Sequence, residues 1–223
     1  MIIYIIIPLL LSFYVCWRFK SKVKEYSQIS LSKTLTGSEI AEMMLRDNGI
    51  YDVQVINTEG SLTDHYNPDK KTVNLSYDVY HGHSLMSAAI AAHECGHAVQ
   101  HSKSYFWLQF RSSVIPLVSV ASQYVQWILL GGVLLINIFP QLLLIGIVLF
   151  ALTTFFSIVT LPVEFDASSR ALAWLNTKGI VKKEEYAVTK DALKWAAATY
   201  VVAAIASVAT LLYYAQVYMG RRN

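Results

Sequence analysis

The run His93-Glu94-Cys95-Gly96-His97 contains the pattern H-E-x-x-H, in which two histidines are four residues apart. Residues at this spacing lie on one face of an α-helix, so both imidazoles can reach one metal ion. A zinc ion with an open position lowers the pKa of its bound water to about 7. Glu94 would lie beside the metal, where it could take a proton from that water. His93 and His97 are therefore candidate zinc ligands, and Glu94 is a candidate general base.

A catalytic zinc usually has three protein ligands, so one more residue must complete the site. His101 is a weak candidate, because it lies about 12 Å from His93 along a helix axis and the two cannot readily share one ion with His97. Beyond His101 the chain has no Asp, Glu or His until Glu164. We assign Glu164 as the third ligand of one zinc ion per chain.

Asp166 follows Glu164 by two residues and could orient a ligating histidine through a hydrogen bond. We expect Pro162 to begin a new helix with Glu164 in its first turn, on which Asp166 and Arg170 form an i,i+4 pair. The alternative is that both carboxylates only cap the N-terminus of that helix.

Long apolar runs must hold these residues in place. Of 223 residues, 55% are hydrophobic and 15% are charged, whereas soluble domains carry roughly 25% charged residues. Runs of this length predict membrane helices. Residues 1–19 form a retained anchor, because positive charges follow the run and no cleavage site appears. Residues 114–163 form a tight transmembrane hairpin, and residues 195–219 form the last span.

The distribution of Lys and Arg predicts the orientation in the membrane. Residues 18–113 and 164–194 contain 16 of the 18 Lys and Arg residues, and only Arg221 and Arg222 fall on the other side. Cytoplasmic loops carry such an excess of positive charge. We therefore expect both hydrophilic regions, and with them the candidate site, to face the cytoplasm.

Residues 20–113 are expected to form a cytoplasmic α+β region. An amphipathic helix covers 35–49, with Thr36 or Ser38 as its cap, and a second helix from Ser84 to Ser102 carries the H-E-x-x-H pattern. Alternating apolar and polar residues predict strands, and Asn67-Pro68-Asp69-Lys70 predicts a turn between two of them. The predicted strands are Tyr51–Ile56, Leu62–Tyr66 and Thr72–Ser76. We take Thr72–Ser76 as the candidate exposed edge for binding an extended peptide.

The remaining polar residues give weaker signals. His65, His81 and His83 lie near the hairpin and its exit loop, and they receive no catalytic role. The two cysteines, Cys16 and Cys95, do not form a disulfide framework. No basic stripe interleaved with aromatic residues is present, which argues against nucleic-acid binding.

Three runs together resemble the YugP-type neutral zinc metallopeptidases of bacterial membranes. They are Thr72-Val73-Asn74-Leu75-Ser76, the run from Ala91 to His101, and Leu161-Pro162-Val163-Glu164-Phe165-Asp166-Ala167-Ser168. The resemblance implies zinc, hydrolysis of peptide bonds and a bacterial plasma membrane. The chain is more distantly similar to the HtpX and Ste24 membrane proteases, which carry the third ligand in a Glu-x-x-Ala-Asp pattern. Glu164 and Ala167 match that pattern, but Ser168 stands where the aspartate would be.

These observations predict a multi-pass α-helical membrane protein with a small α+β, zincin-like cytoplasmic metalloprotease domain. Its segments are an anchor (1–19), the α+β region (20–113), a hairpin (114–163), a helical region with the third ligand (164–194) and a last span (195–219). The leading interpretation is a zinc-dependent endopeptidase in the lipid bilayer that acts on peptides or membrane proteins.

Two other classes of protein are alternatives. The first is a membrane scaffold or adaptor with a structural zinc, although structural zinc sites normally have four protein ligands, often thiolates. The second is a small transporter that uses Gln123 and Gln126, although amides in a span more often bond to a neighbouring helix. The sequence does not specify the substrate, the cleavage preference or the oligomeric state.

Overall fold

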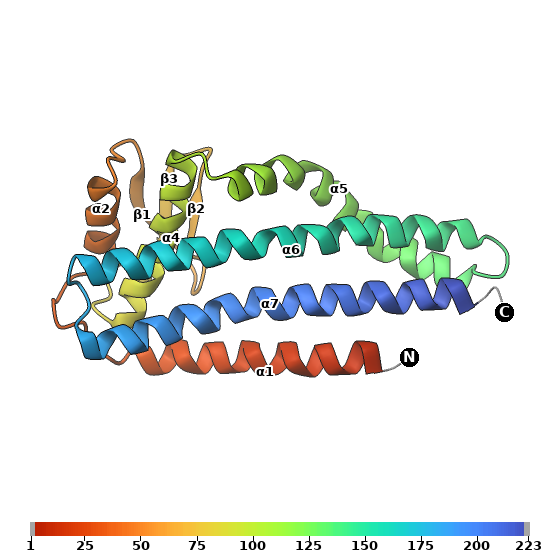
Figure 1. Cartoon of the computed structure of the whole chain (residues 1–223), viewed down its shortest axis with the longest axis horizontal. Coiled ribbons are helices and arrows are strands. Elements are labelled where there is room, and N and C mark those ends of the chain that lie inside the picture. Colours follow the sequence, from red (N-terminus) through yellow and green to blue (C-terminus); the bar gives the residue numbers. More distant parts are fainter. Residues whose placement is uncertain (1–2, 221–223) are drawn as a thin grey trace. The chain divides into compact units, whose positions relative to one another are not determined.

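The computed structural model describes residues 3–220 (Figure 1). The chain divides into two compact units. The helical unit comprises Met1–Cys16, Gln109–Leu161 and Thr199–Asn223, and the α+β unit comprises Trp17–Leu108 and Pro162–Ala198. Four residues used in the sequence-based predictions lie outside the described range: Met1 and Ile2 of the anchor, and Arg221 and Arg222.

Four helices within residues 3–220 are long and apolar enough to cross a membrane, judged by length and composition. They are α1 (Ile3–Tyr26), α5 (Phe106–Leu134), α6 (Pro140–Thr177) and α7 (Lys183–Gly220). Each contains most of one apolar run of the sequence. The helices α6 and α7 continue into the charged segment 164–194, so each supplies residues to both units.

The expectation that Pro162 begins a new helix is wrong, because α6 runs without a break from Pro140 to Thr177. A proline inside a helix removes one backbone hydrogen bond and costs about 3 kcal/mol. Ending one helix and starting another would leave several N–H and C=O groups without intrahelical partners, which is more costly in apolar surroundings. Glu164 therefore lies within a long helix and not in a first turn.

Small residues let α5 and α6 approach closely within the helical unit. The two helices are joined by the short connection 135–139, as the predicted hairpin requires. A Cβ atom built on Gly132 would come within 2.5 Å of the Leu143 Cα atom. Leu143 is fully buried and packs in an apolar cluster with Leu129. Glycine at position 132 thus allows the backbones of the hairpin to meet.

The remaining elements all belong to the α+β unit. They are α2 (Gly37–Asp47), β1 (Gln54–Thr58), β2 (His65–Asn67), β3 (Thr72–Ser76), α3 (Tyr77–Tyr80) and α4 (Leu85–Ser102). Both predicted helices are present, and Thr36 caps the first of them as predicted. The Thr36 hydroxyl accepts from the Glu39 N–H and the Glu39 carboxylate accepts from the Thr36 N–H, which is a capping box. The Ser84 hydroxyl accepts from the Ser87 N–H at the start of α4.

The sheet has the strand order β1-β3-β2, with β1 parallel and β2 antiparallel to β3. The predicted hairpin between β2 and β3 is confirmed. Strand β2 is shorter than predicted, because Gly60 and Leu62 before it have φ angles of 96° and 58° in the left-handed region. Strand β1 begins later than predicted, at Gln54.

The prediction that Thr72–Ser76 is an exposed edge is wrong, because β3 is the central strand and all five of its residues are buried. Its alternating pattern suggested one solvent-facing side. The polar side chains instead find partners inside the protein. Asn74 Nδ2 donates to the His65 carbonyl at 3.2 Å, and Ser76 Oγ donates to the Asp64 carboxylate at 3.1 Å. The edges of the described sheet are β1 and β2.

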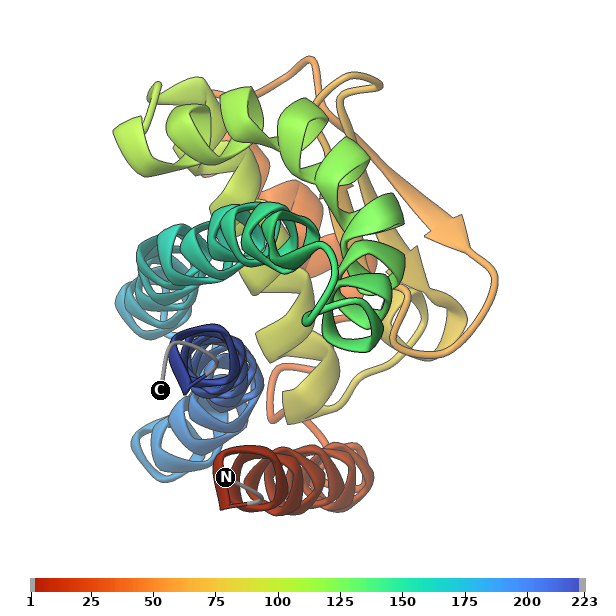
Figure 2. The ribbon, with the colours of Figure 1, turned by 90° about the vertical axis from the view of Figure 1, so that its right-hand side faces the viewer.

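Helix α4, which carries the H-E-x-x-H pattern, is buried along most of its length. It lies beside the strands in both views (Figures 1 and 2). Helix α2 also packs on it, where Cys95 Sγ donates to the Ala41 carbonyl at 3.5 Å. Most buried residues of α4 are small: Ser87, Ala88, Ala89, Ala91, Ala92, Cys95, Gly96 and Ala98. Neighbouring elements can therefore approach its backbone closely from several sides.

Gly132→Ala should destabilise the helical unit, whereas Gly131→Ala should not. The methyl group added at position 132 would clash with the Leu143 backbone, but at position 131 it would lie 3.4 Å from Leu142 Cδ2. Both variants gain a similar helix propensity, roughly 1 kcal/mol, so Gly131→Ala is a matched control. We expect the unfolding temperature in detergent to fall only for Gly132→Ala. Equal unfolding temperatures for the two variants would contradict this close contact.

Candidate metal centre

Helices α4 and α6 bring His93, His97 and Glu164 together in the α+β unit. Glu164 Oε2 lies 3.3 Å from His93 Nε2 and 3.6 Å from His97 Nε2. The imidazole rings of the two histidines have their centroids 4.9 Å apart and are nearly perpendicular, at 83°. One donor atom from each residue therefore points into the same small volume.

Gly96 permits this arrangement, since it lies where α4 and α6 are in contact. A Cβ atom built on Gly96 would lie 2.6 Å from the Ala167 carbonyl oxygen and 3.1 Å from its Cα atom. Ala167 is fully buried and follows Glu164 by three residues on α6. Glycine at this position therefore leaves room for a close neighbour, and that neighbour is the backbone of the helix that supplies Glu164.

Acidic groups and burial both act on the histidines. Glu164 and Glu94 are buried, with 3% and 9% of their surfaces exposed. Burial by itself would lower the pKa of His97. The bond to Glu164, the negative charges of Glu94 and Glu164 and the contact with Gln100 outweigh that effect and raise the pKa of His97 above its ordinary value. The negative charges of Glu94 and Glu164 therefore favour a cation at this site.

The donor set suits zinc. Two imidazole nitrogens and one carboxylate oxygen are common ligands of catalytic zinc sites, which keep a fourth position open. With zinc–ligand bonds of about 2.0–2.1 Å in tetrahedral geometry, ligand atoms lie about 3.3 Å apart. The distances of 3.3 and 3.6 Å between Glu164 and the two histidines are close to that spacing. The three residues thus fit a zinc ion in the type of their donor atoms and in the spacing of Glu164 from both histidines.

Two residues that were not predicted as part of the site contact the Nδ1 atoms of the histidines. Ser168 Oγ lies 3.1 Å from His93 Nδ1, and Gln100 Oε1 lies 3.0 Å from His97 Nδ1. Ser168 occupies the position at which the more distant proteases have aspartate, so its departure from that pattern was a usable signal. Gln100 lies three residues after His97 and was detectable only as a polar residue on a buried helix.

Asp166 is placed differently from the expectation. Its carboxylate accepts hydrogen bonds from Gln100 Nε2 at 2.8 Å and from Arg170 Nε at 2.6 Å. The i,i+4 pair with Arg170 is therefore present as predicted. No direct contact between Asp166 and a histidine occurs among the described residues, and Gln100 is the side chain that contacts both Asp166 and His97.

The other histidines lie outside this cluster. His101 Nδ1 is 2.8 Å from the Tyr66 hydroxyl on β2, and His65 Nδ1 is 2.8 Å from the Thr63 carbonyl. His81 and His83 line a polar hollow of about 540 Å³ beside the start of α4. Within residues 3–220, His93, His97 and Glu164 form the one group of at least three His, Cys, Asp or Glu residues close enough to hold a metal.

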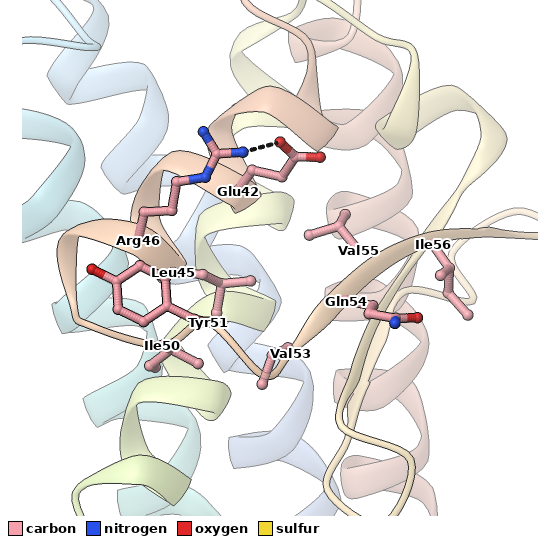
Figure 3. A pocket seen from close by; sticks show the side chains of 9 residues that line it. All are labelled: Glu42, Leu45, Arg46, Ile50, Tyr51, Val53, Gln54, Val55 and Ile56. Atoms are coloured by element: carbon pink, nitrogen blue, oxygen red, sulfur yellow. Dashed lines mark hydrogen bonds and ion pairs between the residues drawn. The ribbon is translucent and has the colours of Figure 1, made fainter.

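A separate hollow of about 400 Å³ lies between α2 and β1 (Figure 3). Leu45, Ile50 and Val53 form part of its apolar wall, and Arg46 donates to Glu42 at 3.0 Å at its side. None of the candidate site residues lines this hollow. It therefore has no part in the metal centre.

Comparison with known proteins agrees with this chemistry. Residues 1–219 match the model of the family described as "Putative neutral zinc metallopeptidase". The chain is also 40% identical over 213 residues to the "Putative membrane protease YugP" of Bacillus subtilis (strain 168), covering 96% of this chain and 94% of that protein. No solved structure is significantly similar to the chain.

Glu164→Ala should sharply weaken zinc binding, because it removes one of three converging donor atoms. We expect a loss larger than the roughly 10–100-fold that follows removal of a residue supporting a ligand. Zinc per chain should be measured by elemental analysis and equilibrium titration on protein purified in detergent without chelators. Glu42→Ala, which removes an exposed carboxylate paired with Arg46, is the matched control. Equal zinc affinity in both variants would exclude Glu164 as a ligand.

Proposed function

Since the chain belongs to the neutral zinc metallopeptidase family, we propose that it is a membrane-embedded, zinc-dependent endopeptidase with one zinc ion per chain. His93, His97 and Glu164 would hold the ion, and Glu94 would be the general base. The observation that carries the proposal is the convergence of two imidazoles and one carboxylate at distances that suit zinc. In this reading the α+β unit is zincin-like, with its catalytic helix packed against a small mixed sheet.

Zinc, when bound, would polarise the scissile carbonyl and lower the pKa of a water at the open position to about 7. Glu94 follows His93 directly on α4, and its negative charge acts on His97, which supports its position beside the metal. Its carboxylate would accept a proton from the attacking water. It would then donate that proton to the nitrogen of the leaving amine.

The strand β2 is the better candidate for binding an extended substrate. It is an edge of the described sheet, and its Tyr66 hydroxyl reaches His101 on α4 at 2.8 Å. His101 lies one helical turn beyond His97, about 6 Å along the axis. The edge of β2 is therefore close to the histidine face of α4, and its free backbone groups could pair with a peptide. Peptides or membrane proteins near the bilayer are the proposed substrates.

The four apolar helices would all cross a bacterial plasma membrane, with both hydrophilic regions in the cytoplasm. This orientation is supported by the 16 of 18 Lys and Arg residues that lie in residues 18–113 and 164–194. All proposed ligands belong to those two regions, so the active site would face the cytoplasm.

Glu94→Gln should abolish peptide hydrolysis while leaving zinc bound. Gln keeps the shape of the side chain but cannot accept the proton, and loss of a general base typically slows a reaction by roughly 10²–10⁴-fold. The measurement is the rate at which the zinc-loaded chain in detergent cleaves a fluorescently labelled unfolded protein. The control is Glu42→Gln, the same substitution at an exposed residue outside the site. Undiminished cleavage by Glu94→Gln would exclude Glu94 as the general base. A zinc-loaded wild type inert toward many unfolded proteins would instead favour the scaffold.

The orientation predicts which positions an impermeant thiol reagent can reach. In a chain carrying Cys16→Ser and Cys95→Ala, we would introduce either Lys70→Cys in the β2–β3 turn or Asn137→Cys in the α5–α6 connection. Both native side chains are exposed. In intact cells the maleimide should label only the Asn137→Cys chain, and the Lys70→Cys chain should react after permeabilisation. The opposite pattern would place the site outside the cytoplasm.

A further inference from the structure

Gln100 has a fully buried side chain at the contact between the two helices that supply the proposed ligands. A buried primary amide is stable only when both its donor and its acceptor groups have partners. Gln100 Nε2 donates to the Val163 carbonyl at 2.8 Å and to Asp166 Oδ2 at 2.8 Å, both on α6. Gln100 Oε1 lies 3.0 Å from His97 Nδ1 on α4. One side chain therefore links the ring of His97 to the backbone next to Glu164.

The partners of Nε2 determine which way the amide is turned. The Val163 carbonyl and the Asp166 carboxylate only accept hydrogen bonds, so the NH₂ group must face them. Oε1 then faces His97 and can only accept. His97 Nδ1 must therefore carry the hydrogen of this bond, which leaves the lone pair of a neutral imidazole on Nε2. Nε2 is the atom that lies 3.6 Å from Glu164 Oε2.

Arg170 keeps Asp166 in place as an acceptor. Its Nε donates to Asp166 Oδ2 at 2.6 Å, and its guanidinium lies 5.7 Å from the centroid of the Tyr105 ring. The same Asp166 oxygen accepts from Gln100. The chain of contacts Arg170–Asp166–Gln100–His97 thus begins at a permanent cation and ends at one proposed ligand.

His93 has no equivalent constraint among the described residues. Its Nδ1 lies 3.1 Å from the Ser168 hydroxyl. A hydroxyl can either donate or accept, so this contact is compatible with both tautomers of His93. The two histidines therefore differ, because the amide of Gln100 selects the tautomer only at His97.

We propose that Gln100 is a positioning residue that commits His97 to the tautomer with its lone pair on Nε2 and aligns Glu164 through the Val163 carbonyl. The inference rests on the proposed function, in which His97 and Glu164 are zinc ligands. It assigns Asp166 the task of orienting Gln100, and not that of touching a histidine. Through one amide, the geometry of the second and third ligands becomes coupled.

The test compares zinc affinity and the visible spectrum of the Co²⁺-substituted protein in full-length variants. Gln100→Met keeps the length and apolar bulk but offers no hydrogen-bonding amide. It should weaken zinc binding by roughly 10–100-fold and change the Co²⁺ ligand-field bands, which report coordination geometry. Ser168→Ala, which removes the hydroxyl beside His93, is the matched control and should have the smaller effect on both readouts.

A pair of variants keeps the test decisive if Gln100→Met folds poorly. Gln100→Glu retains an acceptor for His97 but opposes the Asp166 carboxylate. Adding Asp166→Asn supplies a donor toward the new carboxylate, so the double variant should bind zinc more tightly than Gln100→Glu alone. A purely structural role would lower the unfolding temperature of the metal-free protein without changing the Co²⁺ bands.

Three results would overturn the inference. Unchanged zinc affinity and Co²⁺ bands in Gln100→Met would do so while leaving the proposed function intact, provided that the wild type binds zinc. A zinc affinity that is no higher in the double variant Gln100→Glu, Asp166→Asn than in Gln100→Glu alone would also overturn it. Absence of zinc binding by the wild type would remove the proposed function, and the inference with it.

Discussion

The backbone contact between α4 and α6 at Gly96 and Ala167 is the constraint on which the candidate site depends. His93 and His97 share one helix and meet by local geometry alone, but Glu164 comes from a helix much later in the chain. Its carboxylate reaches both Nε2 atoms because the two backbones approach within a distance that excludes a Cβ atom. The distance between two packed helix axes depends on the side chains at their contact.

Close packing of this kind makes every polar group at the contact costly unless it is paired. The chain meets this requirement with a compact set of hydrogen bonds. Gln100 joins α4 to the Val163 carbonyl and to Asp166, and Ser168 lies against His93. The polar side chains of β3 are paired in the same way, for example Ser76 with Asp64. The polar side chains of α4 at this contact can therefore be buried because each has a hydrogen-bond partner on α6 or on α4 itself.

The unbroken course of helix α6 through Pro162 also helps to position Glu164. Because the helix does not end at Pro162, Glu164, Asp166 and Ser168 lie in a helix interior and not in a first turn. The side chain of Glu164 is thus positioned by a helix interior, which is more rigid than a loop or a fraying terminus. The proline that suggested a boundary in the sequence is instead tolerated within the helix.

The sequence by itself determined the parts of this protein that depend on local spacing and composition. These are the apolar runs, the helix with His93 and His97 four residues apart, the turn at Asn67–Lys70, and the pairing of Asp166 with Arg170. Glu164 was also predictable, since few acidic residues were available after His101. Only the tertiary structure decided that β3 is central, that α6 continues through Pro162, and that Gln100 and Ser168 are the groups touching the histidines. Hydrogen-bond partners across a helix contact depend on where two backbones cross. The residue pattern of either helix alone does not reveal that position.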